Sequence, residues 1–324
     1  MKKRITLAVV GAVALAGISS TAVSQSYPSK SIRLVVPWPP SGTVDILARP
    51  LSQKLTDKLG QSVVIDNRPG ANSIVGSEIV ARSSADGYTL LVDNVTGHAS
   101  NATLYKKLPF SSLKDFAPIA LIASAANVLV MHPSTAAQTV KDVVAGAKSQ
   151  PGKLAYASFG TGSAAHLAGE LFKSEANIDI VHVPYKGGAP ALVDVMGGRV
   201  YMMFASLPSA LGHIQGGKLR AIAIAGTKRA RTLPNVPTSI ESGFPGLDAT
   251  TWYGAMFPAK TPTAIVNLMS LEIGEAIKDP QMAQRFHAMG YELVGSTPQQ
   301  LSQHLKEETI KWGKVVKQSG AQLE

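Results

Sequence analysis

The sequence of 324 residues contains no cysteine. This absence excludes disulfide bonds, thiol nucleophiles, cysteine-ligated zinc, iron–sulfur clusters and a lipid-modified amino-terminal cysteine. The seven histidines show no His-Glu-x-x-His or similar ligand spacing, so the sequence predicts no metal site. The glycine-bearing turn at residues 160–163 lacks the lysine of a phosphate-binding loop and the third glycine of a dinucleotide fingerprint. We therefore expect no cofactor.

Charged residues are scarce, at 16%, whereas hydrophobic residues make up 45%. This balance favours a packed globular chain over a disordered one. The formal net charge is +10, but the lysines and arginines are scattered, and no basic stripe interleaved with aromatic residues occurs. We interpret the densest basic cluster, residues 228–231, as a solvated loop. The sequence therefore predicts no nucleic-acid partner.

Long apolar runs are lacking beyond the amino terminus. There, Lys2-Lys3-Arg4 precedes an apolar stretch over residues 5–17, and Ala22-Val23-Ser24 supplies the small residues of a cleavage site. The stretch is shorter than the ~20 residues that a membrane-spanning helix needs. These features predict a signal peptide over residues 1–24, cleaved near Ser24, and a periplasmic mature protein.

The length and the order of the predicted elements indicate two domains, since one domain typically holds roughly 100–200 residues. Short apolar strands alternate with amphipathic helices, the pattern of α/β folds with largely parallel strands. Two nearly contiguous strands near residue 126 indicate one crossing between domains, and the proline-rich residues 227–247 indicate a second. We expect one lobe over residues 25–126 and 240–324, the other over residues 127–239, and a cleft between them.

A strand, a turn and a helix start over residues 156–167 form the best candidate for an anion site. Gly160 and Gly162 let the backbone approach a ligand, Ser163 can cap the helix, and free N–H groups at the helix start favour negative charge. A carboxylate fits such a site. Residues 39–43 form a matching turn in the other lobe, again with small hydroxyl residues before a helix.

Each of these features also has a plainer interpretation. Both turns can be ordinary rigid connections, and Asp45 can pair with Arg49 four residues on rather than bind a ligand cation. Trp38 can line the cleft or belong to the core, and its flanking prolines favour the cleft. Ser163 and His166 invite a hydrolase hypothesis, but they lack a nucleophile elbow and a third partner. We expect no catalytic residues.

Motifs along nearly the whole mature chain resemble the substrate-binding proteins of tripartite tricarboxylate transporters, the Bug receptors. They are PWPPSG at 37–42, DNRPGA at 66–71, ADGYTLL at 85–91, KDFAPI at 114–119, GSAAHLAGELF at 162–172, VPYKGGAPAL at 183–192, LRAIAI at 219–224 and LPNVPT at 233–238. The resemblance implies a type II-like, two-lobed α/β periplasmic binding protein, each lobe a mixed sheet flanked by helices. It also implies a receptor, not an enzyme, that closes on a small organic carboxylate and presents it to the permease subunits of a membrane transporter.

The resemblance also implies which residues hold the ligand. One carboxylate is typically held by the two strand–helix loops, which in this chain are Ser41, Gly42 and Thr43 in one lobe and Thr161, Gly162, Ser163 and Ala164 in the other. The distal end of the ligand is assigned to Thr96 and Ser206. The candidate set is completed by Trp38, Asn94, Ser158 and Phe204, which lie in or beside the same loops and strand ends.

Two departures from the family pattern prevent copying a ligand from any relative. Ser41 stands where a glycine pair is usual, and Tyr201 stands where an aspartate is common. The family takes dicarboxylates, amino acids and aromatic acids, and we expect a dicarboxylate or an aromatic acid, bound by a monomer. An exported α/β hydrolase using Ser163 and His166, or a sensor that signals through a membrane kinase, are the alternatives.

Overall fold

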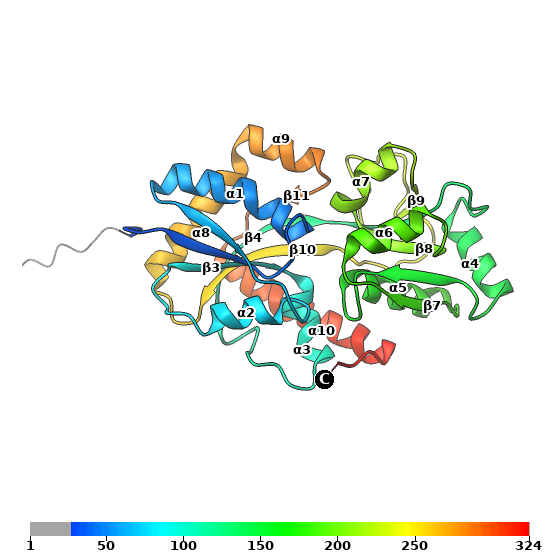
Figure 1. Cartoon of the computed structure of the whole chain (residues 1–324), viewed down its shortest axis with the longest axis horizontal. Helices are drawn as coiled ribbons and strands as arrows, with labels where there is room; N and C mark the ends of the chain where they lie inside the picture. Colours follow the sequence, from blue (N-terminus) through cyan, green and yellow to red (C-terminus); the bar gives the residue numbers. More distant parts are fainter. Residues whose placement is uncertain (1–26, 324) are drawn as a thin grey trace, which may run out of the picture.

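The protein was analysed as a computed structural model that describes residues 27–323. The predicted signal peptide and its cleavage site lie outside the described residues. Two sheets, each flanked by helices, form two lobes that lie side by side in Figure 1. The α/β, two-lobed architecture predicted from the sequence is confirmed.

The first lobe contains a mixed sheet with the strand order β11-β4-β10-β3-β1-β2. Its strands are β1 (Ile32–Val36), β2 (Val63–Asn67), β3 (Thr89–Asn94), β4 (Phe116–Ala125), β10 (Thr251–Pro258) and β11 (Glu292–Leu293). Its helices are α1 (Thr43–Leu59), α2 (Ile74–Ala81), the π-helix η1 (Thr96–Ser100), α3 (Asn101–Leu104), α8 (Thr263–Lys278), α9 (Pro280–Ala288) and α10 (Pro298–Ser319). Strands β1, β2 and β3 are parallel, whereas β10 runs antiparallel to β3 and β4.

The second lobe contains a mixed sheet with the order β7-β6-β8-β5-β9. Its strands are β5 (Asn127–Met131), β6 (Ala155–Ser158), β7 (Val181–Pro184), β8 (Met202–Ser206) and β9 (Arg220–Ala225). Its helices are α4 (Val140–Ser149), α5 (Ala164–Ala176), α6 (Gly188–Met196) and α7 (Leu207–Gln215). Strands β6, β7 and β8 are parallel, and β5 is antiparallel to both of its neighbours.

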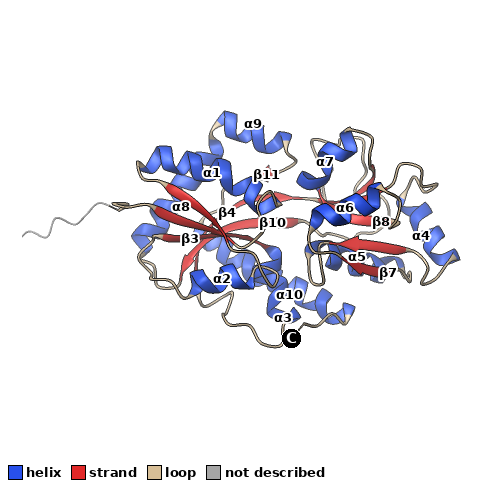
Figure 2. Ribbon diagram, viewed as in Figure 1, coloured by secondary structure: helices blue, strands red, loops and turns tan. Residues whose placement is uncertain are grey.

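Helices cover both faces of each sheet (Figure 2). In the first lobe, α1 and α8 pack their apolar faces on one side of the sheet, through residues such as Leu47 and Ile273. The helices α2 and α10 pack on the other side, through residues such as Val80 and Leu305. Burying each such side chain stabilises the fold by roughly 1.5–3 kcal/mol. The cluster beneath α10 continues into the second lobe, where it includes Phe172. The two lobes therefore share part of one apolar core.

Two crossings join the lobes. At the first, a single residue, Ala126, separates β4 from β5. Residues 227–247, expected to be the second crossing, fold against the second lobe. The Ser239 N–H donates to the Ile224 carbonyl of β9, and the Phe244 ring packs on Phe172 of α5 at 5.8 Å between ring centroids. The chain then returns to β9, where Ala249 N–H donates to the Ala225 carbonyl at 3.1 Å, and it crosses at the start of β10. These contacts lead us to propose that the second lobe ends near residue 248 rather than 239.

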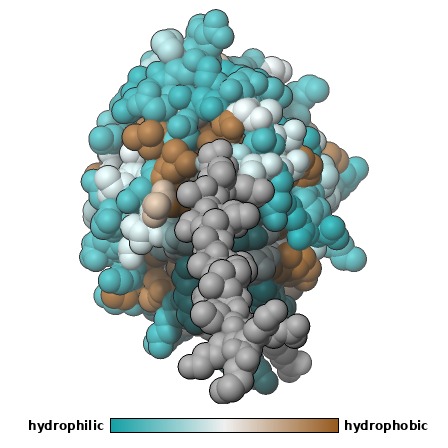
Figure 3. Space-filling model, turned by 90° about the vertical axis from the view of Figure 1, so that its left-hand side faces the viewer, coloured by the Kyte–Doolittle hydropathy of each residue, from teal (hydrophilic) through white to brown (hydrophobic). Residues whose placement is uncertain are grey.

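The face of the molecule drawn in Figure 3 is mainly hydrophilic, with apolar side chains in small separate groups. Within residues 27–323, no helix combines the length and the apolar character that crossing a membrane requires.

Candidate ligand-binding site

The carboxyl edges of the two sheets face each other at the junction between the lobes. Parallel strands place the ends of β1, β2 and β3 at one edge, and the ends of β6, β7 and β8 at the other. Because only Ala126 separates β4 from β5, these edges adjoin. In open α/β sheets, ligands bind outside the carboxyl ends of the strands. The topology therefore brings nearly all loops of the predicted site to the interlobe junction.

The lobes touch at this junction. The side-chain amide of Asn72 donates to the Thr161 carbonyl at 2.9 Å, and Asn101 donates to the Asn72 carbonyl at 2.8 Å. A Cβ atom built on Gly162 would collide with Leu104 of the first lobe. The loop before α5 therefore lies directly against residues that surround α2 and α3.

The first-lobe loop is fixed by Asp45. Ser41 has a φ of 63°, in the left-handed region that a glycine would adopt more readily, and its N–H donates to the Asp45 carboxylate at 2.9 Å. Arg49 binds both carboxylate oxygens, at 2.7 and 3.0 Å, and Asn67 adds a second donor side chain. Burial alone would raise the pKa of Asp45, but these hydrogen bonds outweigh it and hold the pKa below its usual range. The predicted pairing with Arg49 is confirmed, and Asp45 shapes the turn before α1.

Trp38 is anchored by a buried carboxyl group that the sequence analysis did not single out. The indole N–H donates to Asp93 Oδ1 at 2.7 Å, and Ser77 donates to Asp93 Oδ2 at 3.2 Å. Burial raises the pKa of Asp93 to about 7, although these donors and the Asn94 N–H oppose that shift. His98 Nε2 lies 3.4 Å from the same carboxyl group. Trp38 is thereby held beside the carboxyl edge of the first sheet.

The second-lobe loop keeps several of its donors for itself. Gly160 has a φ of 131° and Gly162 a φ of 82°, so both positions favour glycine. The Gly162 N–H donates to His166 Nδ1 at 3.0 Å, and the Ser163 N–H donates to the Gly160 carbonyl at 3.1 Å. Ser163 is the N-cap of α5, as predicted, and its hydroxyl accepts the His166 N–H at 3.3 Å. The N–H groups of Ala164 and Ala165 at the start of α5 have no carbonyl four residues earlier within the helix, which leaves them for an anion.

Three hydroxyl groups from different elements meet at the interlobe edge. Thr43 at the start of α1 and Ser206 at the end of β8 lie next to the hydroxyl of Tyr253 in β10 and oppose the rise in the Tyr253 pKa that its burial causes. The Tyr253 and Ser206 hydroxyls are buried and close to each other, but within residues 27–323 neither forms a hydrogen bond of standard length and angle. Buried polar groups are normally satisfied, so this pair is a candidate contact for a polar ligand atom.

Tyr253 was not among the site residues predicted from the sequence. The signal was a tyrosine near the start of an otherwise apolar strand. Asn94, which was predicted, lies directly opposite Tyr253 in the β3–β10 pairing. Asn94 accepts the Thr96 N–H on its side-chain oxygen at 3.0 Å, so both predicted residues lie at the same edge.

Phe204 and Tyr201 do not join the site. Phe204 is 1% exposed, and its ring packs edge-on against Phe172 at 5.6 Å, within the core. Tyr201 precedes β8 at the end opposite Ser206, and its hydroxyl lies near Gly146 of α4. The departure from the family pattern at Tyr201 therefore lies away from the ligand edge. Ser158 is fully buried and bonded within its own loop and to His182.

The hydrolase hypothesis does not agree with this geometry. His166 Nδ1 accepts from the Gly162 N–H, and the Ser163 hydroxyl accepts from the His166 backbone, so no hydrogen bond joins the hydroxyl to the imidazole. Within residues 27–323, no three His, Asp or Glu side chains are grouped so that they could hold a metal ion.

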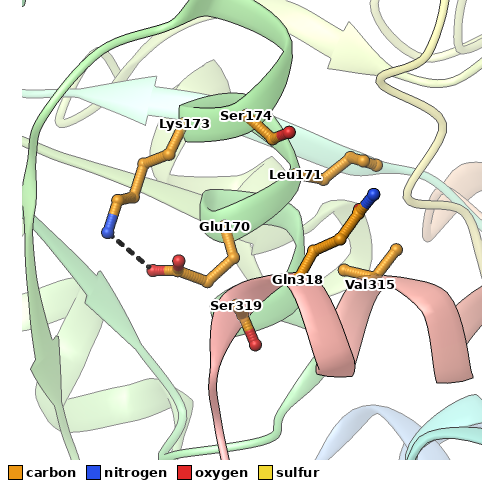
Figure 4. A pocket seen from close by; sticks show the side chains of 7 residues that line it. All are labelled: Glu170, Leu171, Lys173, Ser174, Val315, Gln318 and Ser319. Carbon is orange, nitrogen blue, oxygen red and sulfur yellow. Dashed lines mark hydrogen bonds and ion pairs between the residues drawn. The ribbon is translucent and has the colours of Figure 1, made fainter.

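Two pockets lie apart from the predicted residues. A pocket of about 360 Å³ forms where α5 meets α10 (Figure 4), with the ion pair of Glu170 and Lys173, at 3.3 Å, on one side and Val315 and Gln318 on the other. A second, of about 340 Å³, lies beside both crossings and includes the basic residues 228–231. Neither is lined by a residue of the predicted site.

Comparison with known proteins identifies the family. Residues 47–321 match the sequence model described as tripartite tricarboxylate transporter family receptor. The protein BugT of Bordetella pertussis is 37% identical over 319 residues, which cover 98% of each chain. The R. palustris protein Rpa4515, solved with adipate, is 34% identical with a TM-score of 0.87, covering 92% of this chain and 100% of its own. MatC from Rhodopseudomonas palustris, solved with bound malate, is 28% identical with a TM-score of 0.83, covering 90% and 100%.

These matches span the lobes, the two crossings and the interlobe loops, and they confirm the resemblance seen in the motifs. The chain belongs to the tripartite tricarboxylate transporter receptor family and is a periplasmic solute-binding receptor of the Bug type, not an enzyme.

Proposed function

We propose that this receptor captures a small organic carboxylate, of the dicarboxylate or aromatic acid class, between its lobes and delivers it to the permease subunits of a tripartite transporter. Relatives with bound adipate and malate support the carboxylate class. The observation that carries the proposal is the pair of buried, unpartnered hydroxyls of Tyr253 and Ser206, which come from different lobes and face one junction.

The chemistry of the junction fits an anion. The N-termini of α1 and α5 both begin at the facing edges, and each supplies backbone N–H groups together with the positive end of a helix dipole. Within the proposed site the donors are N–H and hydroxyl groups rather than an arginine clamp. One carboxylate is held at the start of α5, and the hydroxyls of Tyr253, Thr43 and Ser206 bind another polar part of the ligand.

Closure of the lobes completes the site. The contacts of Asn72 with Thr161 and of Gly162 with Leu104 support this closure, because they join the lobes beside the proposed site. The two crossings that allow the motion are tied together by Asn127, whose side-chain amide donates to the Ala249 carbonyl at 2.6 Å. A few residues that connect two rigid bodies are the expected hinge of such a receptor.

Calorimetry with a ligand panel tests the proposal. The panel contains succinate, glutarate, adipate, malate and benzoate, with adipamide as a neutral control of the same length as adipate. We expect saturable binding of at least one carboxylate and none of adipamide. Native mass spectrometry of freshly purified protein would identify a retained ligand directly. Absence of binding to every carboxylate, together with a retained ligand of another chemical class, would contradict the proposal.

A further inference from the structure

Two imidazole groups fix the loop that precedes α5. His166 Nδ1 accepts the N–H of Gly162 at 3.0 Å. His182 Nε2 shares a hydrogen bond of 2.6 Å with the Ser158 hydroxyl, which also bonds Gly160 through its N–H and its carbonyl, each at 3.1 Å. The two histidines therefore hold the two glycines whose positive φ values shape the turn.

The two imidazole rings support each other. Their centroids lie 4.0 Å apart in a stacked arrangement, and His166 is 5% exposed. The charged and titratable groups around them are Glu170 and Lys173 on α5 and Tyr156 on β6. Burial lowers the pKa of both histidines to about 4, with Lys173 contributing to each and His166 contributing to His182. Both rings are therefore neutral near pH 7, and the Nδ1 lone pair of His166 is free to accept.

We propose that His166 and His182 are positioning residues of the carboxylate site, and that their hydrogen bonds to the loop over residues 158–163 aim the free N–H groups of α5 at the interlobe junction. The inference rests on the proposed function, because the loop that they hold is the proposed carboxylate loop. Neither imidazole contacts the ligand in this assignment.

The packing explains why the loop needs such support. Ser163 and Gly162 are buried, so a Gly162 N–H without an acceptor would remain unsatisfied unless the turn shifted. A shifted turn would move Thr161, whose carbonyl binds Asn72 of the other lobe, and it would move Gly162 away from Leu104. The position of the turn is thus linked both to the α5 donors and to the contact between lobes.

Two substitutions of His166 separate positioning from general stability. His166→Asn places an amide oxygen near the former Nδ1 position and keeps an acceptor for Gly162, whereas His166→Leu fills the space without an acceptor. Each loses part of the native packing, so we expect similar losses in Tm. Affinity for the tightest carboxylate found with the wild type should remain close to normal in the asparagine variant and fall by roughly tenfold in the leucine variant. His132→Asn, at a surface histidine of the same lobe that bonds Ser134, is the matched control and should change neither quantity.

The hydrogen exchange of the Gly162 amide provides a readout that needs no ligand. It should accelerate in His166→Leu and stay protected in His166→Asn. In the same way, His182→Gln should retain more affinity than His182→Leu. If affinity follows Tm in both pairs, or if the Gly162 amide exchanges equally in all variants, the inference is overturned while the receptor function stands. If the wild type binds no carboxylate, the proposed function fails instead, before any variant is compared.

Discussion

At the residue scale, two neighbouring tyrosines differ in what their hydroxyl groups do. Their rings lie 5.5 Å apart, but Tyr291 donates to the Thr43 carbonyl at 2.6 Å, whereas the Tyr253 hydroxyl has no partner within residues 27–323. Tyr253→Phe should therefore weaken carboxylate binding by about tenfold or more and leave the free energy of unfolding unchanged or higher, because only the ligand uses this hydroxyl. Calorimetry and denaturant unfolding measure the two effects.

Tyr291→Phe removes the same atom from the adjacent ring and serves as the control. It should cost about 1 kcal/mol of unfolding free energy, because it breaks an existing hydrogen bond, and it should reduce affinity less than Tyr253→Phe does. Equal affinities of the wild type and the Tyr253 variant would remove Tyr253 from the site.

The buried carboxyl group of Asp93 gives a second prediction at this scale. Its pKa is raised to about 7 by burial in the fold, so the folded protein retains a proton that the unfolded chain releases near pH 4. The contribution of Asp93 to stability is therefore fully present below about pH 4 and is lost as the pH rises through 7. Asp93→Asn keeps an acceptor for the Trp38 indole without this titration.

The Tm of the wild type should consequently fall relative to that of Asp93→Asn as the pH rises from 4 to 7. The difference between the two proteins is the relevant quantity, because the lowered pKa values of His166 and His182, which lie in the other lobe, act in the opposite direction in both. Parallel Tm curves for the two proteins would show that Asp93 ionises normally.

At the scale of elements, the turn before α5 controls how closely the lobes approach. Gly162→Ala adds a Cβ that collides with Leu104, and it also strains a φ of 82°. Gly217→Ala in the same lobe has a similar φ of 68° but no atom within 4 Å of the added Cβ. The Gly217 variant should lose only about 1 kcal/mol of stability, the cost of backbone strain. The Gly162 variant should in addition lose most of its ligand affinity.

Binding assays on both glycine variants distinguish strain from the clash between lobes. Normal affinity in the Gly162 variant would mean that Leu104 and the turn need not touch when ligand is bound.

The elements themselves were largely predictable from the sequence, whereas several site contacts were not. Apolar periodicity marks α1, α5 and α10 in the sequence, because each buries one face. The same periodicity could not show the π-helix η1, whose five residues are all buried, or β11, which is too short for a pattern. Phe204 and Ser206 share a face of β8, but only the fold shows that α5 covers the first and leaves the second at the edge.

Contacts between distant segments explain the remaining differences. Ser163 was predicted as an N-cap because the cap lies within its own helix. Tyr253 becomes a candidate ligand contact only because β10 meets α1 and β8 in the fold. Asp93 anchors an indole only because the fold brings Trp38 next to β3. No local pattern encodes such meetings.

At the scale of the whole molecule, the two lobes are joined by two short crossings and by a shared apolar core under α10. In the proposed closure the two crossings act as one hinge, because β4 and β10 pair where they cross and Asn127 bonds Ala249 beside them. The helix α10 of the first lobe also contacts α5 of the second (Figure 1). The proposed capture of a ligand between the lobes therefore requires a motion that the ligand stabilises.

Small-angle X-ray scattering of the purified receptor, first without ligand and then saturated with the carboxylate that calorimetry identifies, tests this account most directly. Since ligand held between the lobes draws them together, the radius of gyration should decrease on saturation, and Tyr253→Phe at the same ligand concentration should show less of the decrease. A radius of gyration that stays the same at full saturation of the wild type would contradict the claim that the ligand binds between the lobes and closes them.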